Sequence, residues 1–452
     1  MADQTSSTLS PKAAKLSIAF HLLTALLAMT PILAVGSGSF AQHLIALAAA
    51  IMLATSAMDP QGEISATAQL LKRFSAAVLF PILWMTLQAI PLSFDSIANP
   101  IWPTTRIALN ESSLPGHISL DPGATLRSLA SYLTILSLVV STAILTKDRQ
   151  RAETTLLVLS TVTTLISFEA LVGQLDLFAG LIPSASTTAA SPLAAAAALG
   201  ALTNGAIIFM LIERHLKRTA VDNRFFGSLM FGLVMSLSGI AISLAAMRAL
   251  AQGSLFAATG LGFLVILFIA IVRRLGFRPW PSAILLAVLI AMAGAASLPH
   301  FQPDASAGLL AFIASPGQNS TSLAISQRAL SDASWVGSGV GTFGLLSRAY
   351  QDFGVAPALV PASTAVSIAI EWGRPALVIL IGFAAQFFLF ALRGAVRRGR
   401  DSFFSSAAAA GVALIVCESF LDASLLNSAV QIIVAVLVGL GLSQSTGRTS
   451  GL

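Results

Sequence analysis

Long apolar runs alternate with short polar segments along the chain, at a spacing typical of membrane-spanning helices. A helix crosses the hydrocarbon core of a bilayer in roughly 20 apolar residues. Twelve runs meet that requirement: 15–35, 41–58, 74–93, 127–146, 154–175, 191–213, 226–247, 252–272, 280–299, 375–393, 402–421 and 425–444. Only the short segment 248–251 separates the seventh run from the eighth. The pattern predicts an all-α polytopic membrane protein with about 12 transmembrane helices and a large loop between the ninth and tenth.

The composition excludes an ordinary water-soluble domain. Of the 452 residues, 56% are hydrophobic and 10% are charged, and the mean hydropathy is +0.86. Soluble domains carry about 25% charged residues. Cys417 is the single cysteine, which excludes a disulfide framework and a thiolate metal site. The five histidines include no closely spaced pair, so we expect neither a zinc site nor another cofactor.

The basic residues predict the orientation, because cytoplasmic loops are enriched in Lys and Arg. With the N-terminus inside, 19 of the 25 basic residues fall on the inner side. These are Lys12, Lys15, Lys72, Arg73, Lys147, Arg149, Arg151, Arg214, Lys217, Arg218, Arg224, Arg273, Arg274, Arg278, Arg393, Arg397, Arg398, Arg400 and Arg448. We therefore expect both termini to be cytoplasmic. The net charge of +6 then reflects topology, and no nucleic-acid partner is expected.

Two long segments are predicted on the outer face. The first, 94–126, interrupts the bundle of spans 1–9 (residues 1–299). The second, 300–374, precedes spans 10–12 and a short cytoplasmic tail (375–452). Long loops are usually either functional or disordered. This segment contains several aromatic residues and dispersed charges, so we expect a folded subdomain. Its apolar stretch 360–370 is expected to form a half-helix or re-entrant segment.

The six basic residues left on the outer side are candidates for an anion site. They are Arg106, Arg127, Arg248, Arg328, Arg348 and Arg374. An arginine donates two parallel hydrogen bonds to a phosphate and stays charged. Arg248 lies between two apolar runs with almost no loop around it, and an ionisable residue in such a place indicates a functional site. The alternative for each arginine is an ion pair with an outer carboxylate or a lipid headgroup.

Two further features of the second outer segment have competing interpretations. The sequence Gly337-Ser338-Gly339-Val340-Gly341 resembles a nucleotide-binding fingerprint but lacks the preceding strand and the following lysine. A tight backbone turn between the segments of Arg328 and Arg348 fits it better. Glu371 either pairs with Arg374 one helical turn away or acts as an acid or base.

Taken together, these features resemble those of the bacterial O-antigen ligase and polysaccharide polymerase superfamily. The shared features are about twelve spans, the early "NPIW" and "ISLDP" segments, an arginine at the outer end of a middle span, "QRALSDASWVGSGVGTF" and "EWG". Two departures stand out. Met247 and Ala249 flank Arg248, where the family has Ser and Gly. Ala362 and Ser363 occupy the positions of a His-Asn pair in family ligases, which favours polymerase over ligase.

The resemblance implies a metal-independent glycosyltransferase of the bacterial inner (cytoplasmic) membrane, acting in exopolysaccharide or lipopolysaccharide biosynthesis. It would move a glycan from a polyprenyl diphosphate (undecaprenyl diphosphate) carrier to a hydroxyl of a glycan or lipid acceptor on the outer face. Arg248 and Arg328 would bind the leaving diphosphate, with Arg348 and Arg374 in second place. The candidates for a catalytic acid or base are Glu371, His300, His117 and Asp332, in that order. The alternatives are an anionic-solute transporter and a non-catalytic membrane partner in a polysaccharide-assembly complex.

Overall fold

The computed structural model describes residues 11–35, 38–57, 69, 72–92, 96–174, 187–217, 223–250, 253–275, 320–352, 360–397 and 401–445. Every regular element in these ranges is helical, and the β-structure there is limited to an isolated bridge between Leu92 and Gly116. The predicted all-α fold class is therefore confirmed. The expected span 280–299 and His300 lie outside the described residues.

The predicted apolar runs in the described part coincide with helices. The elements are α1 (Pro11–Ala28), α2 (Thr30–Val35), α3 (Ser39–Ala57), α5 (Ser75–Ala89), α6 (Ile101–Leu109), α7 (Pro122–Leu145), α8 (Arg149–Gln174), α9 (Thr187–Lys217), α10 (Asn223–Ala249), α11 (Gly253–Leu275), α13 (Ser320–Asp332), α14 (Phe343–Ala349), α15 (Thr364–Glu371), α16 (Arg374–Arg397), α17 (Ser402–Leu421), the 3₁₀ turn η2 (Ser424–Leu426) and α18 (Ser428–Ser445). Nine of these described helices are long and apolar enough to cross a membrane, and Ser17–Ala28 and Ser75–Ala89 are shorter apolar helices. The protein is thus a multi-pass membrane protein, and a lipid bilayer is its environment.

The first predicted run, 15–35, forms two helices in succession instead of one. Pro31 follows the break between α1 and α2, and a proline has no N–H to donate to the carbonyl four residues earlier. That carbonyl belongs to Leu27, and the hydroxyl of Thr30 donates to it instead at 2.6 Å. The division between the seventh and eighth runs is as predicted, because α10 ends at Ala249 and α11 begins at Gly253.

One end of the bundle collects the residues that the charge pattern assigns to the inner side, and we call it the basal end. Arg149 at the start of α8 pairs with Asp401 just before α17, with 3.1 Å between Nη2 and Oδ1. Arg273 near the end of α11 pairs with Glu213 near the end of α9 at 3.3 Å. The first ion pair thus joins the basal ends of α8 and α17, and the second joins those of α11 and α9.

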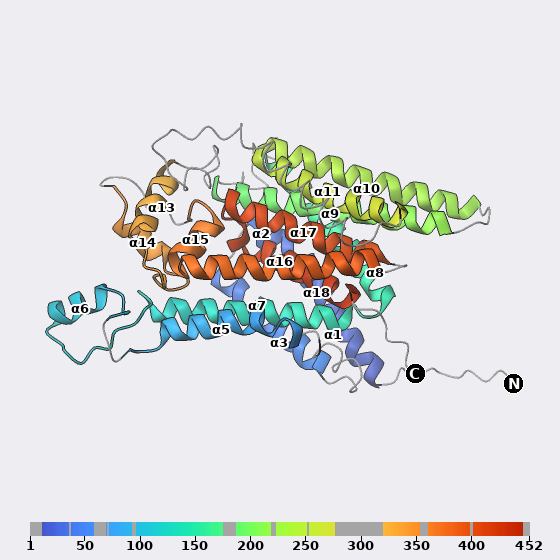
Figure 1. The fold of residues 1–452 in the computed structure, drawn as a ribbon. Helices are drawn as coiled ribbons and strands as arrows, with labels where there is room; N and C mark the ends of the chain where they lie inside the picture. The colour runs from blue at the N-terminus through green and yellow to red at the C-terminus, as the bar shows by residue number, and fades with distance from the viewer. Residues whose placement is uncertain are drawn as a thin grey trace.

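The opposite end, which we call the cap end, holds α6, α13, α14 and α15 (Figure 1). Helices α13 to α15 enclose an apolar cluster distinct from that of the spanning helices, formed by Ile325, Ala329, Leu330, Phe343, Val366, Ala369 and Ile370. The arginines assigned to the outer side lie at this end. Arg374 begins α16, and Arg248 is in the last turn of α10, beyond the contact of Ser243 with Ser167 in the cap-side half of α8.

Candidate functional site at the cap end

The glycine-rich segment forms the turn between α13 and α14, as the sequence predicts. Gly337, Gly339 and Gly341 all have positive φ angles, of 81°, 104° and 82°. L-residues with side chains rarely adopt this conformation. The backbone N–H of Gly339 donates to the carbonyl of Glu371 at 3.0 Å. A Cβ atom at Gly339 would overlap Ser119, so glycine is required here by conformation and by space.

Gln88, near the end of α5, ties this turn to the spanning helices. Its side chain is fully buried, and Nε2 donates to the carbonyls of Val336 at 2.9 Å and Glu371 at 3.0 Å. The backbone carbonyl of Gln88 accepts a hydrogen bond from the N–H of Ser119 at 3.0 Å. Both long outer segments of the sequence are therefore joined at one point above α5.

The carboxylate of Glu371 has a different partner from either interpretation of the sequence. It is buried, and Oε1 accepts a hydrogen bond at 2.8 Å from the backbone N–H of Phe343, the first residue of α14. A carboxylate at a helix N-terminus satisfies a free N–H group and the positive end of the helix dipole. Burial raises the pKa of Glu371, although hydrogen bonds from Gly341 and Phe343 partly oppose this. The geometry favours a capping role, because the carboxyl group is enclosed by the protein.

Arg328 is held in an ion pair of its own. Its two terminal nitrogens donate to Asp352, at 2.8 Å to Oδ1 and 3.1 Å to Oδ2, and Nη1 also donates to the carbonyl of Tyr350. The arginine side chain is 48% exposed, so the pair lies at the surface of the cap. Its planar fork is therefore occupied by a carboxylate, as in the alternative interpretation of the outer arginines.

Three candidate arginines remain exposed at the cap end. Arg374 donates from Nη2 to the carbonyl of Leu330 at 3.0 Å, at the end of α13. Arg248 and Arg348 are exposed in the last turns of α10 and α14, and no carboxylate within the described ranges pairs with either. These three side chains are the cationic groups of the candidate site that stay open to an anion.

The remaining acid–base candidates are separated from one another. Nδ1 of His117 lies 3.0 Å from the carbonyl of Ala89, and its ring packs against Trp102 with 5.0 Å between the centroids. Asp332 is exposed at the end of α13 and accepts a hydrogen bond from the hydroxyl of Tyr350 at 3.0 Å. His300 lies outside the described residues. In the described part of the chain, no three His, Cys, Asp or Glu side chains are grouped as metal ligands.

The two departures from the family pattern at 362 and 363 have structural roles. Ser363 is the N-cap of α15, and its hydroxyl accepts a hydrogen bond from the N–H of Val366 at 3.2 Å. Ala362 is buried, and its N–H donates to the hydroxyl of Ser326 at 3.1 Å. Ala362 thus joins the start of α15 to α13, and Ser363 caps α15.

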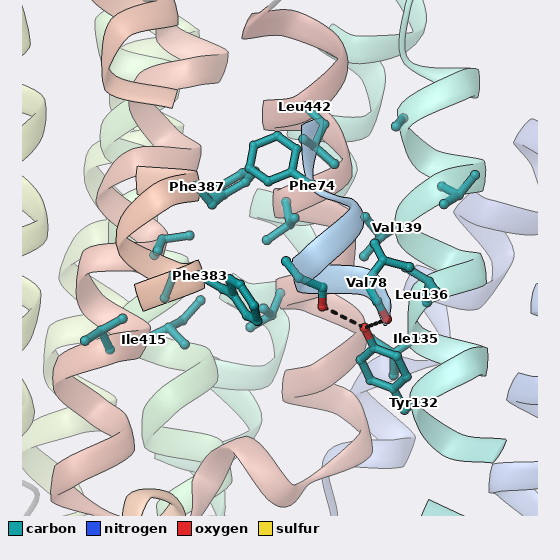
Figure 2. Close-up of a pocket in the computed structure, with 18 residues that line it drawn as sticks. Phe74, Val78, Tyr132, Ile135, Leu136, Val139, Phe383, Phe387, Ile415 and Leu442 are labelled. Carbon is teal, nitrogen blue, oxygen red and sulfur yellow. Dashed lines mark hydrogen bonds between the residues drawn. The ribbon is translucent and has the colours of Figure 1, made fainter. Parts of the chain in front are cut away.

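An apolar cavity of about 350 Å³ lies among the spanning helices, and the sequence pattern does not reveal it (Figure 2). Helices α5, α7, α16, α17 and α18 line it, with the side chains Phe74, Ala77, Val78, Tyr132, Ile135, Leu136, Val139, Val140, Ala143, Phe383, Ala384, Phe387, Val412, Ile415, Val416, Val434, Val438 and Leu442. Its one hydroxyl group, on Tyr132, is turned to the backbone of α5 and lies 3.3 Å from the carbonyl of Ala77 and 3.2 Å from that of Val78. Pro81 has no N–H to donate to the Ala77 carbonyl, so Tyr132 supplies the missing donor. The cavity wall is therefore apolar throughout.

Comparison with protein-family models finds no match to the chain, and comparison with curated protein sequences finds none either. The resemblance to the ligase and polymerase superfamily thus rests on the sequence motifs and the pattern of predicted spans alone.

Proposed function

We propose that the protein transfers a glycan from a polyprenyl diphosphate carrier to a sugar hydroxyl on the outer face of the bacterial cytoplasmic membrane. The observation that carries this proposal is the set of exposed arginines, Arg248, Arg348 and Arg374, at the cap end of a membrane-spanning bundle. Lys and Arg are scarce on the outer side of membrane proteins, so these residues need an anionic partner. A diphosphate at the membrane surface is such a partner.

The reaction needs few groups from the protein. The acceptor hydroxyl oxygen forms a bond to the anomeric carbon, and the bond from that carbon to the diphosphate oxygen breaks. Polyprenyl diphosphate leaves with the bonding electron pair, and the hydroxyl proton passes to a base or to water. Guanidinium groups stabilise the charge that grows on the leaving oxygen. Arg248 and Arg374 are assigned this role, with Arg348 as a further candidate, while Arg328 would have to exchange Asp352 for the diphosphate.

The acid–base role has no assigned residue in this proposal. Glu371 is buried beneath the cap, whereas Asp332 presents an exposed carboxylate. A diphosphate is a good leaving group, so proton transfer to water is compatible with turnover. The absence of the family's histidine at Ala362 favours polymerisation over ligation.

The experiment is a transfer assay with purified protein, a polyprenyl-diphosphate-linked oligosaccharide and a sugar acceptor. We expect longer glycan products on gels for the wild type and a large loss for Arg374→Ala. Arg127→Ala is the matched control, because Arg127 is also exposed at the cap end but pairs with Asp121 at 3.6 Å. Complete lack of product with the wild type, under conditions in which the protein stays folded, would leave the transporter or the assembly-partner alternative.

A further inference from the structure

The apolar cavity described above extends deep into the bilayer. At 1.5 Å per residue, Tyr132 lies about 15 Å along α7 from Pro122 at the cap end, and Ala143 lies about 30 Å along it. Leu442 lies about 20 Å along α18 from Ser428. The hydrocarbon core of a bilayer is about 30 Å thick, so its midplane lies at about 15 Å. The cavity therefore continues past the midplane into the basal half of the membrane.

The five lining helices form a ring, and one side of that ring is closed differently from the others. Helices α5 and α7, α7 and α18, α18 and α17, and α17 and α16 all pack against each other along their lengths. Helices α5 and α16 meet through side chains. The ring centroids of Phe80 and Phe383 are 6.0 Å apart, and those of Phe74 and Phe390 are 5.3 Å apart.

These aromatic contacts form a row that runs from the basal end to the cap end. At the cap end of the row, the indole N–H of Trp84 donates to the carbonyl of Trp372 at 2.9 Å. Phe80 and Phe383 are half-buried, so part of this aromatic row faces the surroundings of the bundle.

Helix α16 carries both a cation and part of the cavity wall. Arg374 is its first residue, and Phe383 and Phe387 lie about 14 Å and 20 Å further along the helix. A ligand with an anionic head at Arg374 and a hydrocarbon chain along α16 would reach the cavity directly. The fatty acyl chain of an outer-leaflet lipid ends near the midplane, whereas a polyprenyl chain is long enough to continue into the basal half.

We propose that the cavity between α5, α7, α16, α17 and α18 holds the distal part of a polyprenyl chain, which enters between α5 and α16. The inference rests on the proposed function, because it takes the carrier lipid as the substrate. It adds that the protein measures the length of the carrier, since only a chain that crosses the midplane fills the cavity. Each added CH₂ group that enters the cavity contributes apolar contacts, although less than a group removed from water, because the chain is drawn from lipid.

Two adjacent alanines on α16 give a matched pair for the test. Ala384 lines the cavity, and Ala385 is exposed on the outside of the bundle. Ala384→Phe places a ring in the cavity, and Ala385→Phe places the same ring toward the lipid. Val434→Phe fills the cavity from α18 and serves as the second variant if Ala384→Phe does not fold.

Each protein is assayed with the same glycan on an undecaprenyl diphosphate and on a farnesyl diphosphate carrier. Binding of undecaprenyl phosphate and farnesyl phosphate is measured in parallel by native mass spectrometry. For the wild type and Ala385→Phe we expect at least tenfold better use of the long carrier, and preferential retention of the long lipid. For the cavity-filling variants we expect this preference to disappear through loss of the long-carrier rate, with the short-carrier rate unchanged.

Equal use of the two carriers by the wild type, or an unchanged preference in the cavity-filling variants, would overturn the inference. Co-purification of a phospholipid that the filling variants lose, without any polyprenyl preference, would also overturn it and assign the cavity to an acyl chain. Failure of the proposed function is distinguishable, because it would abolish transfer from both carriers in all variants. The binding measurement would then decide the inference by itself.

Discussion

Replacement of Gln88 by leucine should destabilise the cap, although the two side chains have similar size. Nε2 of Gln88 donates to two backbone carbonyls, the buried one of Glu371 and the part-buried one of Val336. The carbonyl of Glu371 keeps the N–H of Gly339 as a donor, whereas that of Val336 loses its hydrogen bond from the side chain. A buried acceptor without a partner costs about 1–3 kcal/mol. Because Oε1 of Gln88 is itself buried without a partner, its removal relieves part of this cost, and we expect a net loss of about 1–2 kcal/mol.

Gln386→Leu is the matched control for this substitution. Gln386 is also a glutamine that bridges helices, with Nε2 3.4 Å from the carbonyl of Arg73, but its bond is long and exposed. The assay is thermal unfolding of the purified full chain in detergent, followed by the fluorescence of a thiol-reactive dye at the partly buried Cys417. We expect a lower midpoint for Gln88→Leu and an unchanged one for Gln386→Leu. Equal midpoints for the two variants would refute the assignment of Gln88 as the tie between the turn and α5.

Four further outcomes follow from the geometry. Arg248→Lys should lose nearly as much transfer activity as Arg248→Ala, on the order of 10²–10³-fold, since a lysine lacks the planar fork. Near-normal glycan chains from the lysine variant would show that Arg248 contributes only its positive charge. Gly339→Ala should lower the midpoint of thermal unfolding, because φ is 104° and Ser119 occupies the space of the added Cβ; an unchanged midpoint would contradict the turn geometry. Burial raises the pKa of Glu371, so the stability that this residue contributes is present below its ordinary pKa of 4.5 and is lost as the pH rises through the higher pKa of the folded state. Glu371→Gln should remove this slope from the pH dependence of the unfolding midpoint. An identical slope in the variant would exclude this titration. Ala362→His should give no gain in transfer, because the residue is buried against α13, and a large gain would show that the position is open to the acceptor.

The spanning helices could be predicted because the bilayer imposes one length and one composition on each of them. For the arginines in the described ranges, the end of the bundle at which each lies followed from the same argument, since a wrong number of spans would have scrambled the alternation. The glycine-rich turn was predictable for a local reason, because three glycines in five residues indicate positive φ angles. The break at Pro31 was also encoded locally, but the apolar composition on both sides of it predicted a single helix.

The partners of the polar side chains at the cap could not be predicted. Gln88 and Glu371 are 283 positions apart, and their contact depends on how two outer segments dock on α5. Glu371 and Arg374 are one helical turn apart in the sequence, which made an ion pair between them one of the two interpretations. The carboxylate instead accepts a hydrogen bond from the N-terminus of α14. The cavity is invisible for another reason. Apart from Tyr132, its lining is Val, Ile, Leu, Ala and Phe, as in the residues that pack or face lipid, so no pattern separates the three environments.

We propose that the exposed arginines at the cap end receive a leaving polyprenyl diphosphate. The most direct measurement is the amount of polyprenyl diphosphate released by the purified protein from a lipid-linked oligosaccharide, counted against the glycosidic bonds formed. We expect one carrier released for each bond formed, and the loss of both products together in Arg248→Ala and Arg374→Ala. Bond formation that continues at the wild-type rate in both variants, or no release of carrier by the folded wild-type protein, would contradict it.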